Sequence, residues 1–319
     1  MARSRTIVAA VAVLAMMTAT IARGTTPVPI DGTLTIVGSD TLSALVLRWI
    51  SAFRADHPRV VIQLQTPGSA SAPIALLEGA ADIGLMSRPM SAAEQDSFRR
   101  RFGYAPEEIV VAHDAIVVFV HPDNPLTKIT RKQLDAIFSS TLACGGRGPI
   151  HTWNDLIPGP GISGAPILVT GRNSASGTNE FFRERALCGG TYRPDVVVWP
   201  GHGATVAAVA GNEDAIGYAG AGYVNGLVKP LAYARDDNAP AVEPVMENVM
   251  DGDYALARTL YFYVNQPPDR SSAPLRAAFL DYVLSDQAQG EVGQEGFLPV
   301  TAAERETQKN LIRATIPRP

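Results

Sequence analysis

The sequence has no excess of positive charge, few cysteines and few histidines. Its 319 residues carry 27 lysines and arginines against 31 aspartates and glutamates, which gives a formal net charge of −4. This balance gives no reason to expect nucleic acid or an anionic membrane surface as a partner. The five histidines show no recognised ligand spacing to one another or to a pair of carboxylates, so we expect no metal site and no cofactor.

The N-terminal apolar run is too short for a comfortable membrane span. This run, Ile7–Met17, follows the basic residues Arg3 and Arg5 and precedes the small, polar stretch Thr18–Gly24. The order predicts a secretory signal peptide over residues 1–24, with an uncleaved membrane anchor as the alternative. No cysteine lies near this segment, which excludes a lipid anchor on an N-terminal cysteine. We therefore expect a soluble, exported mature protein.

The chain has only two cysteines, Cys144 and Cys188. In an oxidising compartment we expect them to form a disulfide, which would close a loop of about 45 residues. Two buried free thiols are the alternative.

What the sequence does contain, from Thr33 onward, is a regular alternation of short apolar strands and amphipathic helices. Strands are predicted at 34–38, 60–65, 82–85, 115–125, 196–200, 215–220 and 259–265, with helices between them and a final helix over 277–294. The alternation predicts an α/β fold with mostly parallel strands. The breaks rich in proline and glycine are short, which favours two lobes between which the chain crosses more than once.

The segment Ile167–Leu187 is typical of a strand, a Gly/Ser loop and the start of a helix. It carries Arg172, then Ser176, Gly177 and Thr178. A helix N-terminus attracts anions, and hydroxyls and a guanidinium add hydrogen-bond donors. The loop lacks lysine and any G-x-x-x-x-G-K-[ST] pattern, so it is not a nucleotide P-loop. A small tetrahedral oxyanion is the predicted ligand, and an ordinary capped helix is the alternative.

Three further loops carry similar residues where a strand leads into a helix. They are Gly38–Thr41, Gly68–Ser71 and the pair Ser87 and Arg88. In open α/β sheets, ligands bind outside the carboxyl ends of the strands, where helices begin. Four such loops together predict a converging cage for an oxyanion.

At these residues the chain resembles the periplasmic phosphate-binding proteins, the substrate-binding subunits of high-affinity phosphate ABC transporters. The resemblance covers nearly the whole mature chain and rests on the stretches VGSDTLSALVLRW, GSASAPIALLEGAADIGLMSRPMS, IFSSTLACGGRGPIHTWNDL, GRNSASGTNEFF, AIGYAGAGYV and LYFYVNQPP. It implies a two-lobed type II periplasmic binding protein fold with a hinge and a central ligand cleft. Lobe one would hold 26–112 plus 258–319, and lobe two 113–257. Inorganic phosphate and an inner-membrane ABC permease are the implied partners of a periplasmic monomer.

The resemblance also implies a set of ligand-binding residues. Lobe one would contribute Thr41, the backbone N–H of Leu42, Ser69 and the position of Ser87, and lobe two would contribute Arg172, Ser176, the backbone of Gly177, and Thr178.

The chain departs from the best-known members at two positions where they carry an aspartate. Ser87 stands at one, and Ser174, two residues beyond the arginine, stands at the other. A carboxylate acceptor separates phosphate, which carries a proton at neutral pH, from sulfate, which does not. Asp40 is the nearest candidate for this acceptor because it lies in the first ligand loop, and a plain helix cap is its alternative role.

Two other functions remain open from the sequence. One is the binding of another oxyanion, such as sulfate or molybdate. The other is an exported phosphohydrolase with Ser69 or Ser176 as nucleophile, which would need a base or a metal beside the serine. The G-x-S-x-G elbow is missing, and each histidine is interpreted as structural or exposed, with His202 at an ordinary helix start. We therefore expect a binding protein and not an enzyme.

Overall fold

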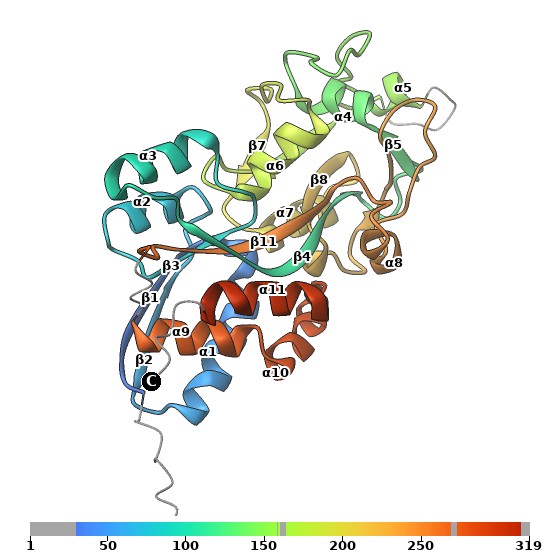
Figure 1. Cartoon of the computed structure of the whole chain (residues 1–319). Helices are drawn as coiled ribbons and strands as arrows, with labels where there is room; N and C mark the ends of the chain where they lie inside the picture. Colours follow the sequence, from blue (N-terminus) through green and yellow to red (C-terminus); the bar gives the residue numbers. More distant parts are fainter. Residues whose placement is uncertain (1–29, 158, 160–163, 269–272, 314–319) are drawn as a thin grey trace, which may run out of the picture.

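The computed structural model describes residues 30–157, 159, 164–268 and 273–313. The predicted signal peptide, 1–24, lies outside these residues. The described part is an α/β structure around one long, curled sheet of nine strands, with helices on both faces (Figure 1). The strand order is β2-β1-β3-β11-β4-β8-β6-β7, and β9 pairs with β4 beside this path. None of the described helices combines the length and the apolar character that a membrane span requires.

The first lobe is built on the end of the sheet formed by β1 (Gly32–Gly38), β2 (Val60–Gln65) and β3 (Ile83–Met86), which are parallel. The largest apolar core of this lobe lies between these strands and α1 (Ser43–Asp56), whose Trp49 is fully buried. A smaller core on the other face lies under α2 and α3. The remaining elements of this lobe are η1 (Asp40–Leu42), α2 (Ser71–Leu77), α3 (Ala92–Phe102), α9 (Pro274–Val283), α10 (Asp286–Gly290), η3 (Val292–Glu295) and α11 (Ala302–Arg313).

The second lobe is built on the other end of the sheet. There β6 (Leu168–Arg172) pairs in parallel with β8 (Ala215–Gly220) and with β7 (Val197–Trp199). Its larger apolar core is separate from those of the first lobe and includes Tyr218, whose ring stacks on Phe182 at a centroid distance of 3.9 Å, and a smaller one contains Phe119 and Val206. The remaining elements are β5 (Lys128–Thr130), α4 (Arg131–Phe138), α5 (Trp153–Leu156), α6 (Gly177–Ala186), α7 (His202–Ala210), η2 (Ala221–Tyr223), β9 (Lys229–Pro230), β10 (Ala232–Ala234) and α8 (Met246–Met250).

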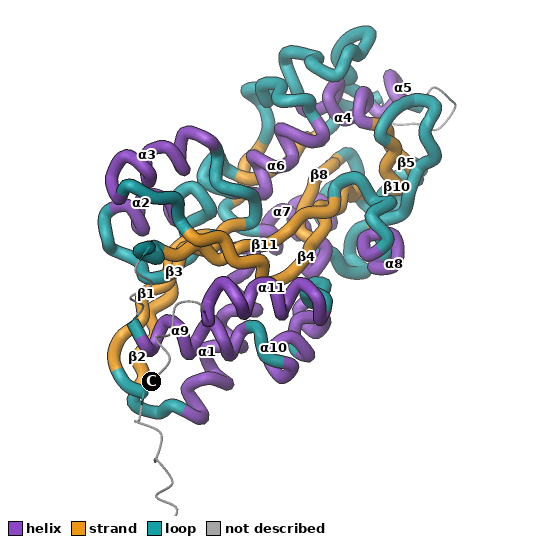
Figure 2. The backbone as a smooth tube through the Cα atoms, in the orientation of Figure 1, coloured by secondary structure: helices purple, strands orange, loops and turns teal. Residues whose placement is uncertain are grey.

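Two long strands in the middle of the sheet connect the lobes (Figure 2). The first half of β4 (Glu107–Val120) pairs with β11 (Ala257–Val264), and its second half pairs with β8, in both cases antiparallel. Because β11 also pairs with β3, the sheet is continuous from one lobe to the other. The fold is therefore the expected two-lobed type II periplasmic binding protein fold.

Three details differ from the expectations. The strand predicted at 115–125 begins eight residues earlier, because charged Asp114 interrupts the apolar pattern of β4 yet is buried and paired. The central strands are antiparallel to their neighbours, so the prediction of mostly parallel strands is wrong in the middle of the sheet, where the chain passes between lobes. The helix predicted over 277–294 is split, because the side chain of Ser285 caps a new helix at α10.

The predicted disulfide between Cys144 and Cys188 is present. It joins the loop after α4 to the turn after α6, and the two helices also contact each other in the core of the second lobe through Phe138 and Phe182. The bridge therefore fixes the outer edge of this lobe.

Replacement of both cysteines with alanine should lower the free energy of unfolding by about 4 kcal/mol, because the unfolded chain regains the freedom of the loop that the bridge closes. Urea unfolding of the oxidised wild type and of the double variant measures this difference. Added reductant should destabilise only the wild type. A double variant as stable as the oxidised wild type would contradict the prediction.

Candidate functional site

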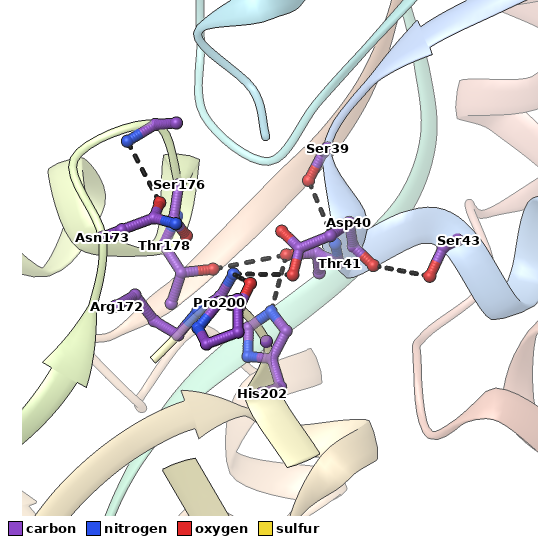
Figure 3. Close-up of polar contacts among 12 residues, drawn as sticks. Ser39, Asp40, Thr41, Ser43, Arg172, Asn173, Ser176, Thr178, Pro200 and His202 are labelled. Carbon is purple, nitrogen blue, oxygen red and sulfur yellow. Dashed lines mark hydrogen bonds and ion pairs between the residues drawn. The ribbon is translucent and has the colours of Figure 1, made fainter. Parts of the chain in front are cut away.

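The predicted ligand loops meet between the two lobes. The first lobe contributes the start of η1 with Asp40 and Thr41, and the second contributes Arg172 at the end of β6 and Thr178 in α6. Figure 3 shows these side chains pointing toward one another across the interface. The hydroxyls of Thr41 and Thr178 lie 3.3 Å apart, although 137 positions separate the two residues in the sequence. Two of the four loops predicted to form a cage therefore meet here.

The N-terminus of α6 faces the loops of the first lobe at very short range. Ser176 caps the helix, its Oγ accepting from the backbone N–H of Thr178 at 3.2 Å. A Cβ on Gly177 would lie 2.3 Å from Ser69 Oγ and 2.6 Å from Ser87 Oγ, so only glycine fits between these two serines. Ser69 and Ser87 are themselves linked, their hydroxyl oxygens lying 3.2 Å apart. Small residues at these positions thus let two loops of the first lobe approach the N-terminus of α6.

Arg172 is the most informative side chain of the site. It is almost completely buried, and its Nη2 donates to Asp40 Oδ2 at 2.6 Å and to the carbonyl oxygen of Pro200 at 3.1 Å. Its Nε and Nη1 are buried without a protein partner among the described residues. A buried donor without an acceptor costs about 1–3 kcal/mol, and more when it is charged. These two nitrogens and their hydrogens therefore mark the place of an external acceptor.

Among the described residues, Asp40 has a buried acceptor without a donor, as Arg172 has buried donors without an acceptor. One carboxylate oxygen, Oδ2, accepts from Arg172, while Oδ1 is buried and has no hydrogen-bond partner in the described part of the chain. The side chain does not cap α1, since the cap of this region is the side chain of Ser39, which accepts from the N–H of Thr41. Of the two roles considered for Asp40, the geometry favours a free acceptor in the cleft.

A second buried ion pair lies behind the threonines. Arg258 on β11 donates through Nε and Nη2 to Asp114 Oδ2 on β4, at 2.9 and 2.6 Å, and neither side chain exceeds 1% exposure. The remaining nitrogen, Nη1, donates to Thr178 Oγ1 at 2.9 Å and to the carbonyl oxygen of Ser87 at 3.3 Å. The strands that connect the lobes thus contribute directly to the site.

His202, at the start of α7, completes this network. Its Nδ1 accepts from the backbone N–H of Gly220 at 3.1 Å, and its Nε2 lies 2.9 Å from Thr41 Oγ1. Burial, and then the nearby charges of Arg172 and Arg258, hold the pKa of this imidazole well below its usual range. The ring is therefore neutral, with its proton on Nε2, because Nδ1 already accepts a hydrogen bond.

Arg88, which the sequence analysis placed in an anion-binding loop, is directed elsewhere. Its guanidinium pairs with Glu94 at 2.7 Å in the first lobe and with Glu180 of α6 in the second. Its charge is matched by two carboxylates, so Arg88 connects the lobes and does not add a free donor to the cleft.

The structure thus brings together all nine residues predicted for the site. Leu42, the least direct of them, is fully buried at the end of η1, next to Thr41. Three further residues of this network, His202, Asp114 and Arg258, are not predicted from the sequence. The last two have a signal in the sequence, because each is a charged residue beside an apolar stretch of a strand, and the two charges are of opposite sign. His202 has a weaker one: it begins a helix just after a strand, as the other site loops do, but without a hydroxyl group.

The site contains no arrangement for nucleophilic catalysis among the residues that the structure describes. Ser69 Oγ contacts only Ser87, and Ser176 Oγ accepts from its own helix, so neither serine has a base beside it. Within the same residues, no group of three or more potential metal ligands occurs. Buried donors around one acceptor are suited to holding an anion. The fold and the cleft together define a solute-binding protein of the type II periplasmic class.

Comparisons with known proteins agree with this class. Residues 24–287 match the model of the PBP superfamily domain. The phosphate-binding protein PstS of Pseudomonas aeruginosa is 43% identical over 277 residues, which cover 86% of this chain and 84% of that protein. The chain therefore belongs to the PBP superfamily and, within it, to the family of the phosphate-binding proteins PstS.

Solved structures show the same fold. A crystal structure from Clostridium perfringens with bound phosphate, described as a phosphate ABC transporter substrate-binding protein, superposes with a TM-score of 0.70 at 26% identity, covering 85% of this chain and all of that one. An ABC-type phosphate transport receptor from Vibrio cholerae superposes with a TM-score of 0.66 at 22% identity, covering 84% of this chain and all of that one.

Replacement of Asp114 with asparagine should lower the free energy of unfolding by about 3 kcal/mol, because it leaves the buried charge of Arg258 without its counter-ion. Urea unfolding measures the loss. The matched control is Asp195→Asn, which removes the carboxylate from an ion pair with Arg193 in which the side chain of Asp195 is 61% exposed, and should cost less than about 1 kcal/mol. Equal losses in the two variants would contradict the structural role of the buried pair.

Proposed function

We propose that this chain is an exported solute-binding protein that captures inorganic phosphate between its lobes and delivers it to an ABC permease. The observation that carries the proposal is the pair of buried donor nitrogens, Nε and Nη1 of Arg172, which have no protein acceptor in the described part of the chain. They lie beside the N-terminus of α6 and the hydroxyls of Thr41 and Thr178. The family assignment points to the same ligand, because relatives in this family are named as phosphate-binding proteins.

Binding in this proposal uses paired hydrogen bonds in a cleft closed to water, and no covalent step. The residues proposed to donate are Thr41, Leu42, Ser69, Ser87, Arg172, Ser176, Gly177 and Thr178, with Leu42 and Gly177 acting through their backbone. The formal charge of −4 does not oppose such binding, since the donors act locally and charge-assisted hydrogen bonds are strong in a desolvated site.

The proposed lobes are 26–112 plus 258–319, and 113–257, moving about the two connecting strands. The distribution of the apolar cores supports these boundaries. On β4, Ala112 belongs to the core of the first lobe and Ala115 to that of the second. Where the chain returns to the first lobe at β11, Leu256 still belongs to the core of the second lobe and Leu260 to that of the first. We further propose that the protein acts as a monomer in the periplasm after its signal peptide is removed.

Asp40 is proposed as the acceptor that distinguishes phosphate from sulfate. Its free oxygen, Oδ1, would accept the hydrogen that phosphate carries at neutral pH. Sulfate carries none, so one of its oxygens would face a carboxylate without a hydrogen between them. The alternative ligands, sulfate and molybdate, are therefore disfavoured by this side chain.

Replacement of Arg172 with alanine should weaken phosphate binding at least about 100-fold, because two charge-assisted hydrogen bonds are lost. Ser176→Ala should also weaken binding strongly. Isothermal titration with inorganic phosphate measures both effects, and thermal unfolding verifies that each variant is folded. Arg183→Ala, which removes a half-exposed arginine from the same helix as Ser176, is the control and should bind as the wild type does. Unchanged affinity in Arg172→Ala would refute the proposed site.

Replacement of Asp40 with asparagine should reduce the preference for phosphate over sulfate at least about tenfold. The amide oxygen can still accept from Arg172, which leaves the amide N–H₂ facing the ligand, where it can donate to a sulfate oxygen but cannot accept from phosphate. The measured quantity is the ratio of the two dissociation constants in one protein, so a general loss of affinity does not affect it. A ratio unchanged from the wild type would exclude Asp40 as the discriminating acceptor.

A further inference from the structure

The hydroxyl of a threonine can donate one hydrogen bond and accept two, so what surrounds it decides what it offers a ligand. In this site the hydroxyl oxygens of Thr41 and Thr178 are each faced by hydrogen-bond donors that come from other parts of the fold. They are the imidazole of His202 on α7 and the guanidinium of Arg258 on β11.

Thr41 receives two of these donors. His202 accepts from the N–H of Gly220 through Nδ1, so the hydrogen of the neutral ring is on Nε2 and points at Thr41 Oγ1, 2.9 Å away. Arg258 Nη2 adds a longer contact to the same oxygen at 3.4 Å. With both lone pairs engaged, Thr41 can only donate its own hydrogen.

The hydroxyl of Thr178 accepts a hydrogen bond from one of these donors, Arg258. Arg258 Nη1 donates to its Oγ1 at 2.9 Å. Its hydrogen cannot go to Thr41, 3.3 Å away, because that oxygen already accepts twice. The hydrogen of Thr178 is therefore left for a ligand, and that of Thr41 goes either to the ligand or to Thr178.

We propose that His202 and Arg258 are positioning residues that occupy both acceptor positions of Thr41, so that the hydrogen of Thr178 points to the bound anion and that of Thr41 points to the anion or to Thr178, and this wall of the cleft offers hydrogens to unprotonated oxygens. Neither residue needs to touch the ligand. The inference rests on the proposed function, and it adds a ligand requirement: a tetrahedral oxyanion must turn any hydrogen it carries away from the hydroxyls of Thr41 and Thr178 and toward Asp40 Oδ1. Asp114 holds Arg258 in place for this task.

The test compares two replacements of His202 that each keep one half of the imidazole. His202→Asn can still accept from Gly220 but cannot reach Thr41 as a donor, whereas His202→Gln places an amide N–H₂ near the position of Nε2. Titration with inorganic phosphate should show binding weakened at least about tenfold in His202→Asn, with most of the loss recovered in His202→Gln. His151→Asn, at an exposed histidine of the same lobe, is the control and should match the wild type.

Two outcomes of this titration would overturn the inference while leaving the proposed function intact: wild-type affinity in His202→Asn, or equal losses in the two variants. If the wild type itself does not bind phosphate, the proposed function fails instead. A second measurement uses the wild-type protein, so it does not depend on whether a variant folds. Nitrogen NMR of the wild-type imidazole should show a neutral ring with hydrogen on Nε2, and hydrogen on Nδ1 would overturn the inference.

Discussion

The buried ion pair between Asp114 and Arg258 is the interaction on which the site and the connection between the lobes both depend. The two residues lie on the two central strands that run between the lobes, and an unpaired charge at that depth would be strongly unfavourable. The pair therefore holds β4 and β11 together where one apolar core ends and the other begins. The same guanidinium reaches hydroxyls from both lobes, at Thr41 and Thr178. The side chain of Arg258 therefore helps to fix both the two strands that connect the lobes and the hydroxyls of the ligand cleft.

Local charge balance explains how a mildly acidic protein can form an anion site. The cleft contains two buried guanidiniums, those of Arg172 and Arg258, and each has one carboxylate partner, Asp40 or Asp114. The charges around the site are thus close to balanced without a ligand, and in the proposed function the anion is held by directed N–H and O–H groups and by the N-terminus of α6. Directed donors discriminate among anions by the position of their hydrogens, which an excess of positive charge could not do.

Much of the fold and the donor loops could be predicted because their signals are local. Strand, Gly/Ser loop and helix start follow one another within a few residues, so Ser69, Ser176 and Gly177 are visible in the sequence itself. The pairs that organise the site are not local. Arg172 is 132 positions from Asp40, and Arg258 is 144 positions from Asp114. His202 was interpreted as structural because nothing near it in the sequence shows that Thr41, 161 positions away, is its partner.

The partner of Arg172 links ligand binding to the contact between the lobes. Position 174, two residues beyond this arginine, is a serine, and the counter-ion of Arg172 is Asp40 of the first lobe. Arg172 is thus neutralised only when the lobes are together, a state that the ion pair of Arg88 with Glu180 and the hydrogen bond from the N–H of Ala70 to the carbonyl oxygen of Ala175 also favour. Because the acceptor proposed to select the ligand is also the group that closes the cleft around Arg172, a ligand that repels Asp40 opposes closure as well as binding.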